Sequence, residues 1–328
     1  MVVQFAAENT QMTTGSPTST DAHPSRRFSI LVGRVSTEDS GRILELLDAL
    51  QAQESAPAYE VILADRRQDG VSACIRAKFP EVQLLSCPPG TSLPELRTLA
   101  FDKSRGDYIV VTEDHCVPSR RWLAGMVEAF RTAPAETVAV GGSVENGVCE
   151  TALDWATFLC EYSSFVGPVR SGPVPSSSVP GMNVAYRRCA IAEIDRAVLT
   201  RGFWETTVHP LLAEQGLSFY LSDGIRILHK KKFSFRLFAT QRFLYSRYYA
   251  GIRFGPDQTA ARLAMCALTV ALPPVLLFRM TKNIIAKKRL FPELIRALPH
   301  LTLFALIWAY GEAVGYMFGP GDALSRIE

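Results

Sequence analysis

Short apolar runs alternate with segments of helical periodicity between residues 28 and 142, and no other feature of the sequence limits the possible folds as much. The pattern predicts buried strands at 28–33, 60–64, 82–86, 108–112 and 137–142. Helices are predicted between them, at 43–53, 71–79, 93–104 and 122–131. This alternation is typical of an α/β domain in which helices flank a mostly parallel sheet.

Polar side chains follow two of these predicted strands directly. Asp65 comes after the second strand, and Glu113, Asp114 and His115 come after the fourth. The carboxyl ends of parallel strands meet at one edge of a sheet, and open α/β folds bind their ligands beyond that edge. We therefore expect these four residues to contribute to one site.

Several classes of protein lack their sequence signature here. No GxGxxG or Walker A motif follows the first strand, and no GxSxG motif occurs, which disfavours dinucleotide-binding, P-loop and hydrolase sites. The seven cysteines form no CxxC pair, so zinc ribbons and disulfide scaffolds are disfavoured as well. A nucleotidyltransferase remains an alternative, although VGRVSTEDSG at 32–41 is a poor phosphate-binding loop.

The two ends of the chain differ from its middle. Residues 1–25 are polar and lack a signal-peptide pattern, so we expect a disordered lead and a body that stays in the cytosol. Residues 226–300 hold 15 basic and 2 acidic side chains, whereas residues 1–225 hold 19 basic and 27 acidic ones. We expect no nucleic acid as a partner, because no nucleic-acid motif accompanies the basic region.

Two apolar stretches, at 263–278 and 301–318, are 16 and 18 residues long, against about 20 for a helix that spans a bilayer. Pro273 and Pro274 interrupt the first stretch, and Glu312 interrupts the second. Four arrangements stay open: spanning helices, a dip into the bilayer that returns at the prolines, helices lying in the interface, and a helix pair packed on protein. We expect contact with membrane lipid at the cytoplasmic face of the plasma membrane.

An ordered set of motifs resembles that of family 2 glycosyltransferases. The motifs are FSILVG and YEVILADRRQDG near the start, RGDYIVVTEDHCVP at 105–118, PGMNVAYRR at 180–188, GFWETTVHPLLAEQG at 202–216 and IRILH at 225–229. The resemblance spans residues 28–255. It implies a GT-A glycosyltransferase domain at 26–255, which the membrane-associated helices at 256–328 follow as an apolar hairpin. It also implies inverting transfer of one sugar from a nucleotide-sugar donor, with UDP-sugars favoured, to a lipid-linked, glycolipid or polysaccharide acceptor.

The same resemblance assigns four residues to the donor. Asp65 is expected to accept a hydrogen bond from the base or ribose, and Arg97 is expected to neutralise phosphate. Glu113 and Asp114 lie in the segment that matches the family's acidic motif, and Asp114 is expected to face the ribose. A divalent metal, Mn²⁺ in preference to Mg²⁺, is expected at the leaving diphosphate.

The predicted metal ligands are Glu113, His115 and His229. Glu113 and His115 flank one residue, so alternation after the strand can place both on one side. His229 ends the predicted strand at 225–228 and matches a family position that supplies a further ligand. The family's Asp-x-Asp motif is replaced here by Glu113-Asp114-His115.

Glu205 is the candidate catalytic base, since inversion requires a group that takes the proton of the acceptor hydroxyl. If 204–215 is helical, His209 shares a face with Glu205 and can orient it or contact the acceptor. Asn183 and Tyr245 are also expected on the acceptor side. Thr206 stands where the family carries an acidic residue, and together with His115 it motivates a non-enzyme alternative, a degenerate membrane scaffold.

Overall fold

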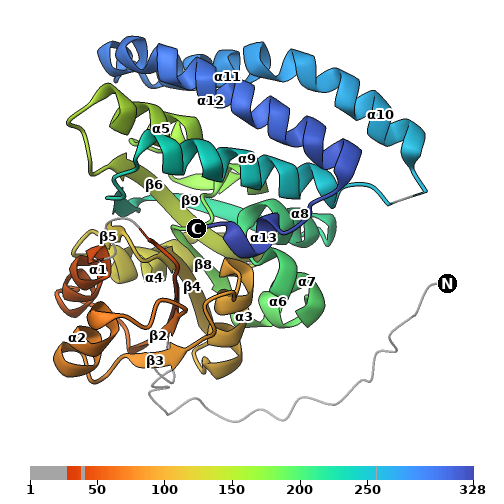
Figure 1. Ribbon diagram of the computed structural model, residues 1–328. Coiled ribbons are helices and arrows are strands. Elements are labelled where there is room, and N and C mark those ends of the chain that lie inside the picture. The colour runs from red at the N-terminus through yellow and green to blue at the C-terminus, as the bar shows by residue number, and fades with distance from the viewer. Residues whose placement is uncertain (1–27, 38–40, 256) are drawn as a thin grey trace, which may run out of the picture.

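The computed structural model describes residues 28–37, 41–255 and 257–328, so the predicted disordered lead at 1–25 lies outside the described residues (Figure 1). Strands of the described part form one nine-stranded sheet with the order β3-β2-β1-β4-β8-β6-β9-β5, and β7 pairs with β9. Helices cover both faces of this sheet. The predicted α/β architecture with flanking helices is confirmed.

The amino-terminal half of the sheet is parallel, as predicted. Its strands are β1 (Phe28–Arg34), β2 (Tyr59–Asp65), β3 (Gln83–Ser86) and β4 (Tyr108–Glu113). The helices between them are α1 (Arg42–Gln51), α2 (Gly70–Lys78) and α3 (Leu93–Lys103). These bounds lie within two residues of the predicted ones, because β1, β2 and β4 are short apolar runs that are mostly buried.

The other half of the sheet is mixed. It contains β5 (Cys116–Pro118), β6 (Thr137–Asn146), β7 (Gly172–Val174), β8 (Val184–Arg187) and β9 (Ser218–His229). Strand β8 runs antiparallel between β4 and β6, whereas β6 and β9 are parallel. The strand-and-helix alternation did not predict β8, because four residues are too few to show a periodicity.

Alternate side chains of the parallel strands enter two cores. Ile30 and Val32 of β1 face the core covered by α1, α2, α4 (Trp122–Thr132) and α5 (Ala152–Tyr162). Leu31 faces the opposite core, which is covered by α3, α6 (Arg188–Ala192), α7 (Arg196–Gly202) and α8 (Glu205–Glu214). The sheet is thereby fixed between two helical layers, and only its edges remain open for a ligand.

The apolar stretches form a hairpin of long helices, as predicted, on the side of α9 (Phe235–Gly251) and α5 (Figure 1). Its first arm is α10 (Thr259–Leu268), the 3₁₀ turn η2 (Thr269–Ala271) and α11 (Leu272–Lys287), and its second arm is α12 (Phe291–Phe318). Both arms are long and apolar enough to cross a membrane by length and composition.

The chain does not turn back at Pro273 and Pro274. The alternative in which the first apolar stretch dips into the bilayer and returns at these prolines is therefore wrong. Both prolines lie in the first turn of α11, where their missing N–H groups cost no helical hydrogen bond. The chain reverses instead at Lys288 and Leu290, whose φ angles are 53° and 61°. Each arm is therefore helical along its whole length and does not turn back half-way.

Helix α12 lies along α9 at close range. A Cβ atom on Gly311 would overlap the Ser246 hydroxyl, and one on Gly315 would overlap the backbone carbonyl of Arg247. Beyond α12 the chain returns to the sheet edge as α13 (Ala323–Arg326), at the centre of Figure 1. Ala323 and Ile327 of this segment are fully buried, so it is an integral part of the folded body.

Candidate active site

The carboxyl ends of β1, β2 and β4 lie side by side, because these strands are parallel and in register. Strand β9 adds His229 to the same region, since His229 pairs with Cys116 of β5, directly after His115. A cavity of about 1010 Å³ lies against this edge. Most of the predicted site residues line it: Arg97, Glu113, Asp114, His115, Glu205, His209, His229 and Tyr245.

Potential ligand atoms of Glu113, His115 and His229 converge at one point of the cavity. The Nε2 atoms of the two imidazoles are 2.9 Å apart, and His115 Nε2 lies 3.2 Å from Glu113 Oε2. Neighbouring ligands of an octahedral cation are about 3 Å apart, because each lies about 2.1 Å from the ion. The spacings of His115 Nε2 to Glu113 Oε2 and to His229 Nε2 thus both match the distance between neighbouring ligands of a divalent cation.

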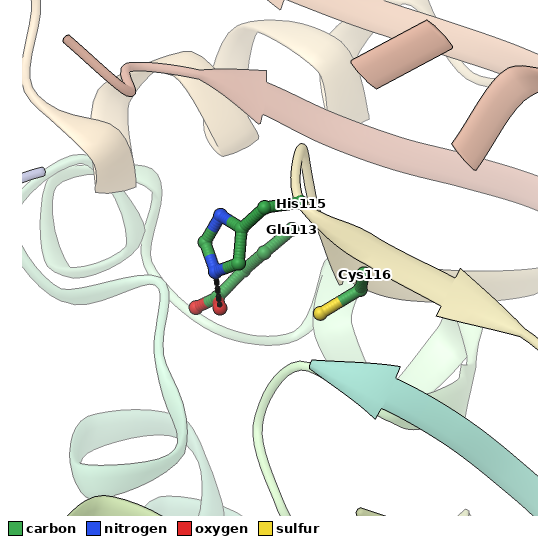
Figure 2. Close-up of side chains that lie close together, drawn as sticks. All are labelled: Glu113, His115 and Cys116. Carbon is green, nitrogen blue, oxygen red and sulfur yellow. Dashed lines mark ion pairs between the residues drawn. The ribbon is translucent and has the colours of Figure 1, made fainter. Parts of the chain in front are cut away.

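Cys116 is a further potential ligand that the sequence did not suggest (Figure 2). The ligand atoms of Glu113, His115 and Cys116 all lie within 4.8 Å of one another. Burial and the charge of Glu113 raise the pKa of the Cys116 thiol well above its ordinary value. A thiol binds metal as the thiolate, so His229 completes the set better than Cys116 does.

Asp114 holds His115 in its orientation. Asp114 Oδ1 accepts from His115 Nδ1–H at 2.8 Å, which fixes the ring so that its Nε2 faces Glu113 Oε2 and His229 Nε2. The Ser36 hydroxyl and the backbone amides of Val35 and Ser36 donate to the same carboxylate at 2.8–3.2 Å. Both oxygens of Asp114 are thus bound within the protein, and the ribose contact expected of Asp114 would require one of these bonds to open.

The charges at this point favour a bound cation. Burial alone would raise the pKa of Glu113, but the hydrogen bond and charge of His115, with Arg97 and His229, lower it to about 2. Burial alone would lower the pKa of His115, but Asp114 and Glu113 raise it. Burial and the charge of His115 lower the pKa of His229. At neutral pH, Glu113 is ionised and His229 is neutral, which are the forms that bind metal, whereas the raised pKa of His115 favours a proton on Nε2 that a bound cation would displace.

Glu205 is the first residue of α8 and lines the same cavity. Burial raises the pKa of Glu205, although its own backbone amide and the charge of Arg97 act in the opposite direction. Arg97 Nη1 donates to the Phe203 carbonyl at 3.0 Å, and Arg97 Nη2 lies 3.6 Å from Glu113 Oε1. A carboxylate with a raised pKa is suited to accept a proton near neutral pH.

Both ring nitrogens of His209 are hydrogen-bonded within the protein, and neither contacts Glu205. Its Nδ1 lies 3.0 Å from the Ser176 carbonyl, and its Nε2 lies 2.7 Å from the Tyr186 hydroxyl. Because a carbonyl only accepts, Nδ1 carries the proton and Nε2 accepts from Tyr186. His209 therefore ties α8 to β8 and to the loop segment η1 (Ser176–Ser178).

The structure does not bring Asn183 or Asp65 to the cavity. The Asn183 side chain is fully buried, accepts from Trp122 Nε1 at 2.7 Å and donates to the Ser143 carbonyl at 2.9 Å. Asp65 is 1% exposed and forms a buried ion pair with Arg34 at 3.2 Å. Both were chosen by motif position, and a motif does not show where the hydrogen bonds of a side chain go. Tyr245 does line the cavity, and the centroid of its ring lies 5.5 Å from that of the Trp204 ring.

The carboxyl-terminal segment reaches the site, which no sequence pattern indicated. Glu328 accepts hydrogen bonds from the Thr37 amide at 3.1 Å and the Thr37 hydroxyl at 2.7 Å. Arg66 donates to the carbonyls of Ser325 and Ile327. Lys231 Nζ, which is buried, lies 3.9 Å from Glu328 Oε2. Thr37 and Glu328 are 291 positions apart, so only the tertiary fold brings them together.

The sequence profile described as glycosyl transferase family 2 matches residues 37–191. These residues include Arg97 of α3 and the segment from Glu113 to His115 at the end of β4, which line the cavity. This part of the chain therefore carries a domain similar to glycosyl transferase family 2. No curated protein sequence matches it.

A solved structure has the same fold over most of the chain's length. A mannosyltransferase from Pyrobaculum calidifontis, solved in complex with GDP-Man and Mn²⁺, is 16% identical, and the match covers 88% of each chain with a TM-score of 0.53. S. aureus TarS 1-349 in complex with UDP is 13% identical, and the match covers 87% of this chain and 90% of TarS 1-349 with a TM-score of 0.45. The former match shows a common fold across nearly the whole length.

Gly181 is expected to be required for activity of this glycosyltransferase, because a Cβ atom on it would overlap the Glu205 carboxylate. We expect Gly181→Ala to displace that carboxylate and lower kcat by about tenfold or more, since small displacements of a reacting group have large effects. The thermal midpoint should change little. Gly90→Ala is the matched control, because no atom lies within 4 Å of a Cβ at Gly90. Unchanged kcat in Gly181→Ala would contradict a catalytic role of Glu205.

Replacing His209 by glutamine is expected to change how stability depends on pH. Burial lowers the pKa of His209 to about 4 from an ordinary 6.5, so the unfolded chain binds more protons between these values. The stabilisation that comes from the neutral ring is fully present above pH 6.5. It decreases as the pH falls from 6.5 through 4, and the free energy of unfolding falls by at most about 3 kcal/mol as a result. Urea unfolding of both proteins from pH 4.5 to 7.5 should show their difference in unfolding free energy shrinking towards low pH. A constant difference would contradict the buried neutral state.

Proposed function

We propose that this enzyme transfers one sugar from a nucleoside-diphosphate sugar, with inversion, to a hydroxyl group of a lipid-linked, glycolipid or polysaccharide acceptor at the cytoplasmic face of the plasma membrane. The observation that carries the proposal is the convergence of Glu113, His115, His229 and Glu205 on one cavity. The apolar hairpin and the basic residues beside it support the membrane location.

In the proposed reaction, Glu205 accepts the proton of the acceptor group. The acceptor oxygen forms a bond to the anomeric carbon, while the bond from this carbon to the diphosphate oxygen breaks and leaves its electron pair on the diphosphate. Arg97 lines the same cavity, and we assign it to the donor, because its charge would offset that of the leaving group. Attack from the side opposite to the leaving group inverts the anomeric configuration.

The donor site is proposed to include a divalent cation held by Glu113, His115 and His229. When bound, the cation supplies positive charge at the oxygens of the departing diphosphate. Oxygen and imidazole ligands favour Mn²⁺ over Mg²⁺, and the mannosyltransferase of the same fold was solved with Mn²⁺ and GDP-Man. We favour a UDP-sugar as donor.

Donor binding and hydrolysis by the detergent-solubilised protein test this proposal. A panel of UDP-, GDP- and dTDP-sugars is measured with Mn²⁺, Mg²⁺ or EDTA. We expect turnover of one donor that requires the metal and is lost in His115→Ala. If no nucleotide sugar binds with any metal, the proposed donor class and metal site are wrong.

A further inference from the structure

The Glu328 carboxylate is surrounded by donor groups from two distant segments. Its Oε2 atom accepts from the Thr37 amide at 3.1 Å and from the Thr37 hydroxyl at 2.9 Å, and the same atom lies 3.9 Å from Lys231 Nζ. An amide, a hydroxyl and an ammonium group thus converge on one oxygen atom. Such a set of donors binds an anion through charge-assisted hydrogen bonds.

Lys231 is the cationic part of this anion site. Its side chain is 1% exposed, and its ion pair with Glu328, at 3.9 Å, is longer than the 2.7–3.2 Å of an ordinary hydrogen bond. The other charged-group contact of Nζ is with the Phe233 ring, 4.8 Å from the centroid. A buried ammonium group has lost its water and is stabilised by a close anion, so the contact with Glu328 leaves it incompletely satisfied.

The anion site adjoins the predicted donor site. Asp114 accepts from the backbone amides of the two residues that precede Thr37. Burial alone would raise the pKa of Asp114, but the hydrogen bond and charge of His115, together with the charge of Lys231, lower it. Lys231 and Glu328 both line the cavity. A donor phosphate that approaches this part of the cavity is therefore attracted by Lys231 and repelled by Glu328.

The backbone next to Glu328 is firmly held. Arg66 donates to the Ile327 carbonyl at 3.1 Å, and the Ile327 side chain is fully buried. Gln241 donates to the Arg326 carbonyl at 3.2 Å and accepts from the Glu328 amide at 2.9 Å. The Glu328 side chain can therefore leave the anion site by rotation about its own bonds, while the backbone of the segment stays in place.

A phosphate group suits this anion site better than the glutamate does. Both carboxylate oxygens of Glu328 accept from the Thr37 hydroxyl, at 2.7 and 2.9 Å, and neither is within hydrogen-bond distance of Lys231. A phosphate group has a third oxygen and a larger negative charge. It can bond Thr37 and Lys231 at the same time, which the carboxylate does not do.

We propose that the Glu328 carboxylate is an internal competitor of the sugar donor, which occupies the anion site of Thr37 and Lys231 until a phosphate group of the donor displaces it. This inference rests on the proposed function, since it names a group that binds the donor and a group that blocks it. The apparent affinity for the donor is lowered by the fraction of molecules in which Glu328 fills the site. Glu328 takes no part in the transfer step itself.

Calorimetric binding of inorganic pyrophosphate to the full-length, detergent-purified protein tests the proposal. EDTA is present, so only groups of the protein bind the probe. We expect Glu328→Gln and Glu328→Ala to bind pyrophosphate at least about fivefold more tightly than the wild type, and Lys231→Gln at least about tenfold more weakly. The matched controls are Asp322→Asn and Lys232→Gln, which remove exposed charges beside the two residues and should bind like the wild type.

Wild-type affinity in both Glu328 variants would overturn the competition, and their thermal midpoints show whether they are folded. An equal loss in Lys232→Gln and Lys231→Gln would overturn the anion site, because the effect would then be general charge. The absence of pyrophosphate binding by the wild type and both Glu328 variants would overturn it as well. Donor hydrolysis by the wild type with Mn²⁺ is measured in the same preparation. If hydrolysis is present while the Glu328 variants bind pyrophosphate like the wild type, only this inference is wrong. If no nucleotide sugar binds while the pyrophosphate affinities change as expected, the proposed function is wrong and the anion site is not.

Discussion

Glu205→Gln should lower kcat for sugar transfer by about 10²- to 10⁴-fold while donor binding stays close to normal. Glutamine keeps the size of the side chain but cannot take the proton of the acceptor. Burial raises the pKa of Glu205, so the wild-type rate should fall as pH falls through that raised value, because the base becomes protonated. The measurements are steady-state transfer over a range of pH and donor affinity by calorimetry.

Glu214→Gln is the matched control, because Glu214 ends the same helix and is exposed. It should transfer sugar at the wild-type rate and with the wild-type pH profile. If Glu205→Gln also keeps the wild-type kcat, Glu205 is not the base. If Glu205→Gln loses donor affinity as well as rate, its carboxylate contributes to the donor site instead.

His115→Ala should weaken Mn²⁺ binding by at least about 100-fold, because it removes one of three converging ligand atoms. Asp114→Asn should have a smaller effect, about 10- to 100-fold, since Asp114 acts by orienting His115. Electron paramagnetic resonance of free Mn²⁺ measures the affinity directly and does not depend on turnover.

His300→Ala is the control for these variants, because His300 is on α12 and does not line the cavity. Its Mn²⁺ affinity should equal that of the wild type. If His115→Ala binds Mn²⁺ as tightly as the wild type does, the cation site is elsewhere. If Asp114→Asn weakens Mn²⁺ more than His115→Ala does, Asp114 would itself be a ligand.

Much of the glycosyltransferase domain could be predicted from local patterns. The parallel strands β1, β2 and β4 are short, mostly buried apolar runs, and the helices between them repeat apolar residues at helical spacing, so each could be recognised in a short stretch of sequence. The cluster of Glu113, His115 and His229 could also be predicted, because the ends of neighbouring strands meet at one edge of the sheet. The family motifs gave Glu205, which does line the cavity.

The patterns were less informative where a side chain has several potential partners. Asp65 and Asn183 stand in family motifs, yet in the structure Asp65 pairs with Arg34 and Asn183 bonds to Trp122 and the Ser143 carbonyl. His209 has the helical spacing to reach Glu205, but it bonds Tyr186 and Ser176 instead. A position on a strand or helix predicts a direction, not which of the nearby groups a polar side chain will bond.

Periodicity, burial of short apolar runs and the order of motifs are local properties, and they were enough to indicate the fold class, the polar cluster at the sheet edge and the apolar hairpin. The contact of Glu328 with Thr37 and the insertion of β8 between β4 and β6 join segments far apart in the chain. Long-range contacts of this kind depend on how whole helices and strands pack, which no short segment of sequence specifies. The part of the cavity lined by α9, α11 and α12 is formed by such packing, so only the tertiary structure shows it.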